Sequence, residues 1–154
     1  MKLYHGTTAD FQIPDLSKGR PMTDFGVGFY LTDKEHMAKN WRKGRPNNHV
    51  NIYELTLANI QSCELRIKRY RTANVEWAKF VYKNRKTKRV SHPYDLIIGP
   101  LADNGLEEWF SRLDKGEVTW EDLARGIEFK KFRALQYCFV KPNAIKLLEY
   151  AERK

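Results

Sequence analysis

The stretch Met22–Trp41 (MTDFGVGFYLTDKEHMAKNW) constrains the fold most, because it runs from a loop through a strand into a helix without a spacer. Two glycines within Asp24–Gly28 permit tight or left-handed backbone. Phe29–Leu31 is an apolar and aromatic run too short for a helix, and is predicted as a strand. Thr32-x-x-Glu35 is a capping-box pattern that predicts the start of a helix. Tyr30 should therefore lie in a short strand, between a flexible loop and a helix N-terminus.

The rest of the chain mixes short strands with helices of unequal length. Short apolar or alternating runs predict strands at His49–Leu57, Cys63–Ile67, Tyr94–Ile98 and Gln136–Val140. A further short strand is predicted from Lys2, and it breaks at Gly6 into the polar residues Thr7 and Thr8. Helical spacing of apolar residues predicts helices at Thr72–Lys86, Leu106–Leu113 and Thr119–Ile127. Thr119-x-x-Asp122 is a second capping pattern, at the start of the last of these helices, whereas Ile145–Tyr150 fits a strand or a helix. The stretch 9–28 follows neither period and is predicted as a long loop. This order predicts one α+β domain over residues 1–154, and not a regular parallel doubly wound sheet.

Composition excludes several classes of protein. Hydrophobic residues make up 42% of the chain, which argues against disorder. No apolar run approaches the ~20 residues of a membrane helix, and Met1–His5 is not a signal peptide, so we expect no membrane association. Cys63 and Cys138 are the only cysteines, which predicts a reducing, cytoplasmic setting without a disulfide framework. The four histidines show no zinc-ligand spacing with the cysteines, so no structural metal is expected.

The net charge is +9, from 28 Lys and Arg against 19 Asp and Glu. The excess is concentrated in three segments: Arg66–Arg71, Lys83–Arg89 and Lys130–Arg133. Such segments attract polyanions, which means nucleic acid, acidic protein or a phosphate-bearing cofactor. A solvated surface explains them equally well.

Polar residues at strand ends are the candidates for chemistry, because nucleotide-binding, metalloprotease and serine-hydrolase motifs are missing from the sequence. They are His5-Gly6-Thr7, Tyr30, Asp103-Asn104 and Gln136. Taken alone, each has a structural explanation: a hydrogen-bonded histidine, a core aromatic, a helix cap or a solvated glutamine. Their order along the chain favours a shared functional site.

That order resembles the three-part signature of ADP-ribosyltransferases, specifically the diphtheria-toxin and poly(ADP-ribose) polymerase branch, with its histidine, tyrosine and usual glutamate. The closer resemblance is to a small bacterial family described as a domain of unknown function, which is thought to have the same fold. Its motifs appear here as Tyr4-His5-Gly6, Asp24-Phe25-Gly26-Val27-Gly28-Phe29-Tyr30, Trp77-Ala78-Lys79-Phe80 and Tyr94–Asp103. The resemblance covers roughly residues 2 to 150. It implies an α+β domain with a split, mostly antiparallel β-sheet flanked by helices.

The resemblance also implies that NAD+ is the substrate and assigns contacts to it. His5 is expected to bind a ribose hydroxyl, and the backbone of Gly6 to bind the nicotinamide amide. Tyr30 is expected to stack on the nicotinamide ring, a contact worth ~1–2 kcal/mol when dry. Thr7 is a secondary contact, and Arg20 is assigned to the pyrophosphate.

The third position departs from the pattern, because Gln136 keeps a carbonyl acceptor but lacks the negative charge of glutamate. Three outcomes stay open. Transfer to a strong nucleophile needs no general base; another carboxylate substitutes, with Asp103 first and Glu54 next; or the site binds NAD+ without turnover. Asp103 is equally explained as a helix cap.

These features predict a bacterial, cytoplasmic mono-ADP-ribosyltransferase that relies on His5, Tyr30 and Gln136, with Asp103 assisting. Its acceptor would be a nucleic acid or a protein. By analogy, it would serve as a toxin or defence effector with a neutralising antitoxin partner. One alternative is an inactive NAD+ or ADP-ribose-binding module. Another is a basic nucleic-acid-binding protein whose aromatic residues, such as Tyr70, Trp77 and Tyr82, stack on bases.

Overall fold

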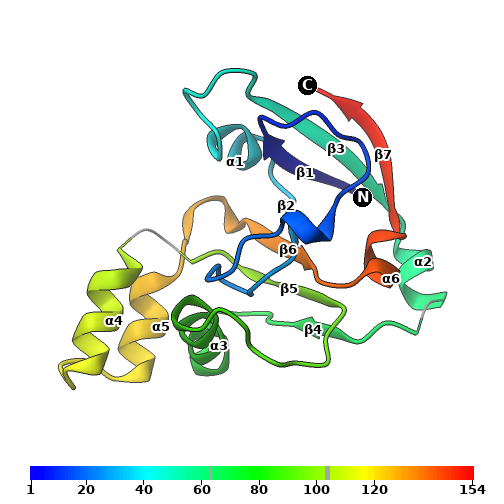
Figure 1. Ribbon diagram of the computed structural model, residues 1–154. Coiled ribbons are helices and arrows are strands. Elements are labelled where there is room, and N and C mark those ends of the chain that lie inside the picture. Colours follow the sequence, from blue (N-terminus) through cyan, green and yellow to red (C-terminus); the bar gives the residue numbers. More distant parts are fainter. Residues whose placement is uncertain (63, 103–104) are drawn as a thin grey trace.

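The computed structural model describes residues 1–62, 64–102 and 105–154, and it confirms an α+β fold (Figure 1). Seven strands form one sheet in the order β4-β5-β6-β2-β1-β3-β7. Among the strands of the described residues, β4 and β5 pair in parallel, and every other pairing is antiparallel. The strands are β1 (Lys2–Thr7), β2 (Phe29–Thr32), β3 (His49–Leu55), β4 (Ile67–Arg69), β5 (Leu96–Pro100), β6 (Leu135–Phe139) and β7 (Leu148–Arg153). The helices are α1 (Glu35–Asn40), α2 (Leu57–Ser62), α3 (Val75–Lys86), α4 (Leu106–Asp114), α5 (Trp120–Ile127) and α6 (Pro142–Ile145), with short 3-10 turns η1 (Leu16–Lys18) and η2 (Lys131–Arg133).

The sheet has a core on each face because its strand residues alternate between the two sides. On β5, for example, Leu96 and Ile98 belong to one core, whereas Ile97 belongs to the other. We call these the first face and the second face. The first face lies under the loop after β1 and under α6. On the second face, α3, α4 and α5 gather over the β5–β6 side of the sheet (Figure 1).

Helix α1 covers β1 and β3 on the second face, where Ala38 packs with Val50 and Ile52. The helix lies so close to the sheet that a Cβ atom at Gly6 would be 1.9 Å from the Ala38 carbonyl oxygen. Gly6 is thus required by helix packing, whatever ligand its backbone contacts.

The pairing between β1 and β2 is confined to one residue pair, Tyr4 with Thr32. In contrast, β1 pairs with β3 along its full length, and β2 pairs with β6 through four consecutive residues. The predicted break of the first strand at Gly6 is wrong, because the ladder with β3 continues through Gly6 to Thr7. The sheet therefore consists of two well-paired groups, β4-β5-β6-β2 and β1-β3-β7, joined by a single short contact. Beyond that contact, no further residue pair joins β1 to β2 among the described residues, and we call this unpaired stretch the opening between β1 and β2.

The structure corrects the expected start of the first helix. Thr32 lies in β2, and α1 begins at Glu35 after Lys34, which gives no side-chain cap. Glu35 instead pairs with Lys39 at 2.9 Å. The second capping pattern is confirmed, because Thr119 and Asp122 form a full capping box at α5. Strand pairing overrides the local capping preference at Thr32, whereas no strand competes at Thr119.

Two further segments differ from expectation. The predicted strand Cys63–Ile67 does not form at those bounds, because α2 ends at Ser62 and β4 begins only at Ile67. Cys63 lies outside the described residues. The ambiguous Ile145–Tyr150 segment divides into the end of α6 and the start of β7, because Pro142 starts a helical turn before the edge strand. Among the described residues, no helix is long and apolar enough to span a membrane.

Replacing Gly6 with alanine should destabilise the fold by at least ~2 kcal/mol, because the added methyl group collides with the backbone of α1. Urea unfolding measures this change. Gly44→Ala is the matched control, since Gly44 has a φ of +80° but open space around it, and should cost only about 1 kcal/mol. Equal effects of the two substitutions would contradict the packing explanation.

Candidate functional site at the opening between two strands

The backbone of Gly6 points into the opening between β1 and β2. Gly6 lies opposite Val50 of β3. Val50 donates to and accepts from Lys154, at 2.7 and 2.8 Å, so its polar backbone groups point away from β1. Because facing residues in an antiparallel ladder either both point their polar groups toward each other or both point them away, Gly6 turns its N–H and C=O away from β3. They face the side where pairing with β2 has ended.

His5 fills part of this opening. Its Nδ1 lies 2.7 Å from the carbonyl oxygen of Tyr30. The ring thus provides the hydrogen bond that a backbone N–H of β1 would provide if the two strands were paired here. Because a carbonyl only accepts, Nδ1 carries the hydrogen, and Nε2 of the neutral ring is left as an acceptor. The imidazole packs on Phe29, with ring centroids 4.3 Å apart. His5 is therefore held in one orientation and one tautomer.

Burial lowers the pKa of His5 to about 4. The hydrogen bond to the Tyr30 carbonyl opposes this shift, while the positive field of Arg42 adds to it. At neutral pH the ring is uncharged, so it offers an acceptor lone pair and no positive charge.

Two further acceptors lie beside His5 on the first face. Asn51 is directly opposite His5, and His49 is opposite Thr7. Within the described part of the chain, Asn51 Oδ1 and His49 Nε2 are buried without a hydrogen-bond partner. Since buried polar groups are nearly always paired, these atoms indicate a place for a donor-bearing group. The sequence did not single out Asn51, because its position opposite His5 depends on strand register.

Arginines gather at the same end of the sheet. Burial lowers the pKa of Arg42, and the positive charges of Arg20 and Arg45 lower it further. No carboxylate of the described residues lies within ion-pair distance of these three guanidinium groups. Uncompensated arginines beside one another are suited to a phosphate or pyrophosphate. Arg20 was anticipated from the sequence; Arg42 and Arg45 were not, since they lie in an irregular segment after α1.

The side chain of Tyr30 lies on the second face, away from the His5 ring. Its hydroxyl donates to the Gly26 carbonyl at 2.6 Å, accepts from the Phe25 amide at 3.0 Å, and lies 2.9 Å from Thr23 Oγ1. Burial raises the pKa of this hydroxyl. The hydroxyl therefore anchors the loop before β2, while the expected stacking of the ring on nicotinamide stays a prediction.

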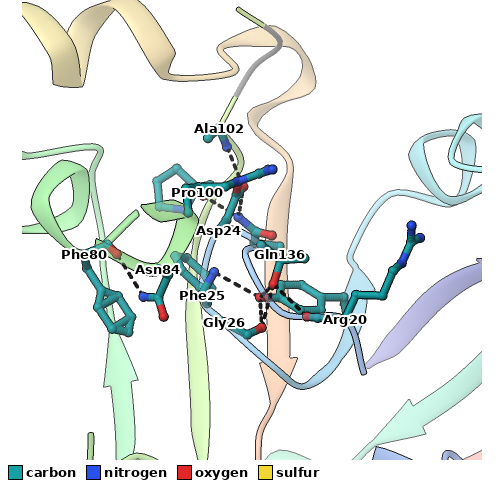
Figure 2. Close-up of polar contacts among 12 residues, drawn as sticks. Arg20, Asp24, Phe25, Gly26, Phe80, Asn84, Pro100, Ala102 and Gln136 are labelled. Atoms are coloured by element: carbon teal, nitrogen blue, oxygen red, sulfur yellow. Dashed lines mark hydrogen bonds and ion pairs between the residues drawn. The ribbon is translucent and has the colours of Figure 1, made fainter. Parts of the chain in front are cut away.

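Gln136 also lies on the second face and is 5% exposed. Its Nε2 donates to Asp24 Oδ2 at 2.9 Å and to the Pro100 carbonyl at 3.1 Å (Figure 2). Gln136 faces Thr32 of β2, and Thr32 in turn faces Tyr4 of β1. These three residues form a row across the sheet at the point where the opening begins.

Asp24 joins its own loop to three other parts of the chain. Its Oδ1 accepts from Arg85 of α3, with Nε at 2.8 Å, and its Oδ2 accepts from Gln136 and from the Ala102 amide at 3.2 Å. Figure 2 shows Gln136 and Ala102 converging on Asp24, while Arg20 extends away from them. The sequence pointed to the loop around Asp24 but not to this role, because no local signal shows which residues meet a loop carboxylate.

The predicted residues thus separate into two groups. His5, Gly6 and Thr7 line the opening from β1, whereas the Tyr30 side chain and Gln136 lie on the second face, where Gln136 meets Asp24. Glu54 is remote from both groups: it pairs with Lys2 in the strand ladder and lies 3.9 Å from the N-terminal ammonium. Asp103 and Asn104 lie outside the described residues.

A separate hollow of about 460 Å³ lies beside the loop that leads into β2. The residues that line it include Leu16, Gly19, Val27, Lys88 and Arg89. It does not include His5 or Gln136, so it is an additional surface feature and not the opening itself.

The fold and site define an α+β protein with a polar, arginine-flanked opening between two halves of one mostly antiparallel sheet. The chain belongs to the family described as protein of unknown function DUF3990, whose model matches residues 1–150. This match confirms membership in a family of unknown function. Comparison with curated proteins and with solved structures gave no match.

Protein stability should fall as the pH decreases from 6.5 to 4. In this range His5 is protonated in the unfolded chain but stays neutral in the folded protein, so protonation favours unfolding. The loss should reach roughly 3 kcal/mol near pH 4. Urea unfolding of the wild type and of His5→Gln across this range isolates the contribution, since other groups cancel in the difference. Parallel pH curves for the two proteins would contradict the buried, neutral state of His5.

Replacing Tyr30 with phenylalanine should cost roughly 1–3 kcal/mol, because the change removes the partner of the Phe25 amide and of Thr23. Amide hydrogen exchange should accelerate most in residues 23–28. The ring itself remains, so binding of an aromatic ligand should persist. An equal acceleration of amide exchange throughout the chain would show that the hydroxyl does not anchor this loop.

Proposed function

We propose that the chain binds NAD+ in the opening between β1 and β2 and transfers its ADP-ribose group to a macromolecule. The orientation of Gly6 is the observation that carries this proposal. Its N–H and C=O face the opening together, and a carboxamide, such as that of nicotinamide, offers the matching acceptor and donor. This agrees with the contact that the resemblance to ADP-ribosyltransferases assigns to Gly6.

The neighbouring groups fit the rest of the dinucleotide. The neutral His5 ring offers Nε2 as an acceptor, and Asn51 Oδ1 is a second acceptor on the same face. Ribose hydroxyls are donors that would satisfy both. The grouped guanidiniums of Arg20 and Arg42 would bind the pyrophosphate.

The proposed reaction is a substitution at C1′ of the nicotinamide ribose. The bond from C1′ to the pyridinium nitrogen breaks, and its electron pair leaves with nicotinamide, which becomes neutral. A lone pair of the acceptor forms the new bond to C1′, and the proton of the acceptor passes to solvent. The oxocarbenium-like transition state gains from nearby acceptor oxygens, and Gln136 would supply one. A neutral glutamine favours single transfers over polymer synthesis.

The acceptor in this proposal is a nucleic acid or a protein associated with nucleic acid, because the chain has a net charge of +9. A small basic enzyme of this kind would act in bacteria as a toxin or defence effector, held in check by an antitoxin. This biological role rests on analogy with other transferases.

A second candidate function is an NAD+ or ADP-ribose-binding module without turnover. Hydrogen bonds within the protein favour this candidate, because the Tyr30 hydroxyl and both Gln136 amide hydrogens already have protein partners. The two candidates share the same binding site and differ only in chemistry.

Incubation of the purified protein with radiolabelled NAD+ and a bacterial lysate distinguishes the candidates. A transferase should label a macromolecule and release nicotinamide, and His5→Ala should reduce both at least tenfold while the protein stays folded. Nuclease or protease treatment then identifies the class of acceptor. Thermal stabilisation by NAD+ without label or nicotinamide would favour the binding module. Salt-sensitive oligonucleotide binding that ignores NAD+ and survives His5→Ala would refute both.

A further inference from the structure

The amide of Gln136 has a single permitted orientation. Both of its Nε2 hydrogens are used, one by the Asp24 carboxylate and one by the Pro100 carbonyl. These partners only accept hydrogen bonds, so a reversed amide would place its oxygen against two other oxygens. Oε1 is therefore the Gln136 atom that faces away from Asp24 and Pro100. Within the described residues, no donor is bonded to it.

Asp24 holds a negative charge directly behind this amide. The Asp24 side chain is 8% exposed, and the side chain of its partner Arg85 is 35% exposed. Arg85 contacts Oδ1, whereas Gln136 contacts the other oxygen, Oδ2. A hydrogen bond from an amide to a carboxylate polarises the amide and increases the negative charge on its oxygen.

The geometry points to Asp24 as the positioning residue for Gln136. Asp24 fixes Oε1 as an acceptor for the substrate, and its carboxylate, behind the Gln136 amide, supplies the negative charge that glutamate carries in the enzymes that the sequence resembles. This inference rests on the proposed function. It explains why a glutamine occupies position 136, since a carboxylate there would lie about 3 Å from Asp24 Oδ2 without a hydrogen between them. Gln136 and Asp24 act as one unit.

The row across the sheet connects this unit to the opening. Gln136 faces Thr32, and Thr32 faces Tyr4, the residue at which β1 and β2 separate. An acceptor at Gln136 is thus placed at the level where the opening begins, on the face opposite His5.

A charge-exchange cycle tests the inference with four full-length proteins: wild type, Asp24→Asn, Gln136→Glu and the double variant. Nicotinamide release gives kcat and KM, and thermal unfolding gives Tm. Asp24→Asn should lower kcat at least tenfold while KM changes less than threefold, because the Gln136 amide can reverse. Gln136→Glu should lower both kcat and Tm, because two carboxylates face each other. The double variant should regain most of both, because the introduced asparagine amide can donate to the introduced glutamate carboxylate.

Asp114→Asn is the matched control, since Asp114 is an exposed carboxylate that pairs with Lys86 on the helical side. Its kcat should equal that of the wild type. A Gln136→Glu protein as active and as stable as the wild type would overturn the inference, and so would a double variant no better than the single variants. If the wild type releases no nicotinamide, the proposed function fails, but recovery of Tm in the double variant still tests the Asp24–Gln136 unit independently.

Discussion

The end of pairing between β1 and β2 is the constraint on which the site depends. After Tyr4 and Thr32 the strands separate, and this separation leaves polar backbone groups without a ladder partner. Unpaired buried backbone groups are costly, so each needs another partner. His5 satisfies the Tyr30 carbonyl, at 2.7 Å, and thereby becomes fixed in one tautomer. The Gly6 groups face the same opening.

Tyr30 and Asp24 stabilise the β2 side of this opening. The Tyr30 backbone binds His5, while its hydroxyl holds the loop before β2 at Phe25 and Gly26. That loop brings Asp24 to Gln136 and Arg85, which connects β2 to β6 and to α3. Gly26, with a φ of +81°, provides the left-handed turn that the loop needs. One short segment of the chain therefore joins the opening to both cores.

Local patterns were sufficient to predict the parts of the fold that depend on sequence neighbours. The apolar run at Phe29–Leu31 and the Thr119 capping box are confirmed, as is the α+β class. The Thr32 capping box was wrong because a strand partner claims that residue. Asn51, Arg42 and the Asp24–Gln136 contact were missed because they depend on register and on the path of long loops. Such long-range contacts leave no periodic signal in a single sequence.

Binding of NAD+ in the opening between β1 and β2 is tested most directly by titrating NAD+ into the isotopically labelled protein and following its amides by NMR. The amides of Gly6 and Tyr30 should show the largest shifts, because they border the opening. His5→Ala should weaken the response at least tenfold. Shifts centred instead on Lys88 and Arg89, beside the separate hollow, would contradict binding in the opening.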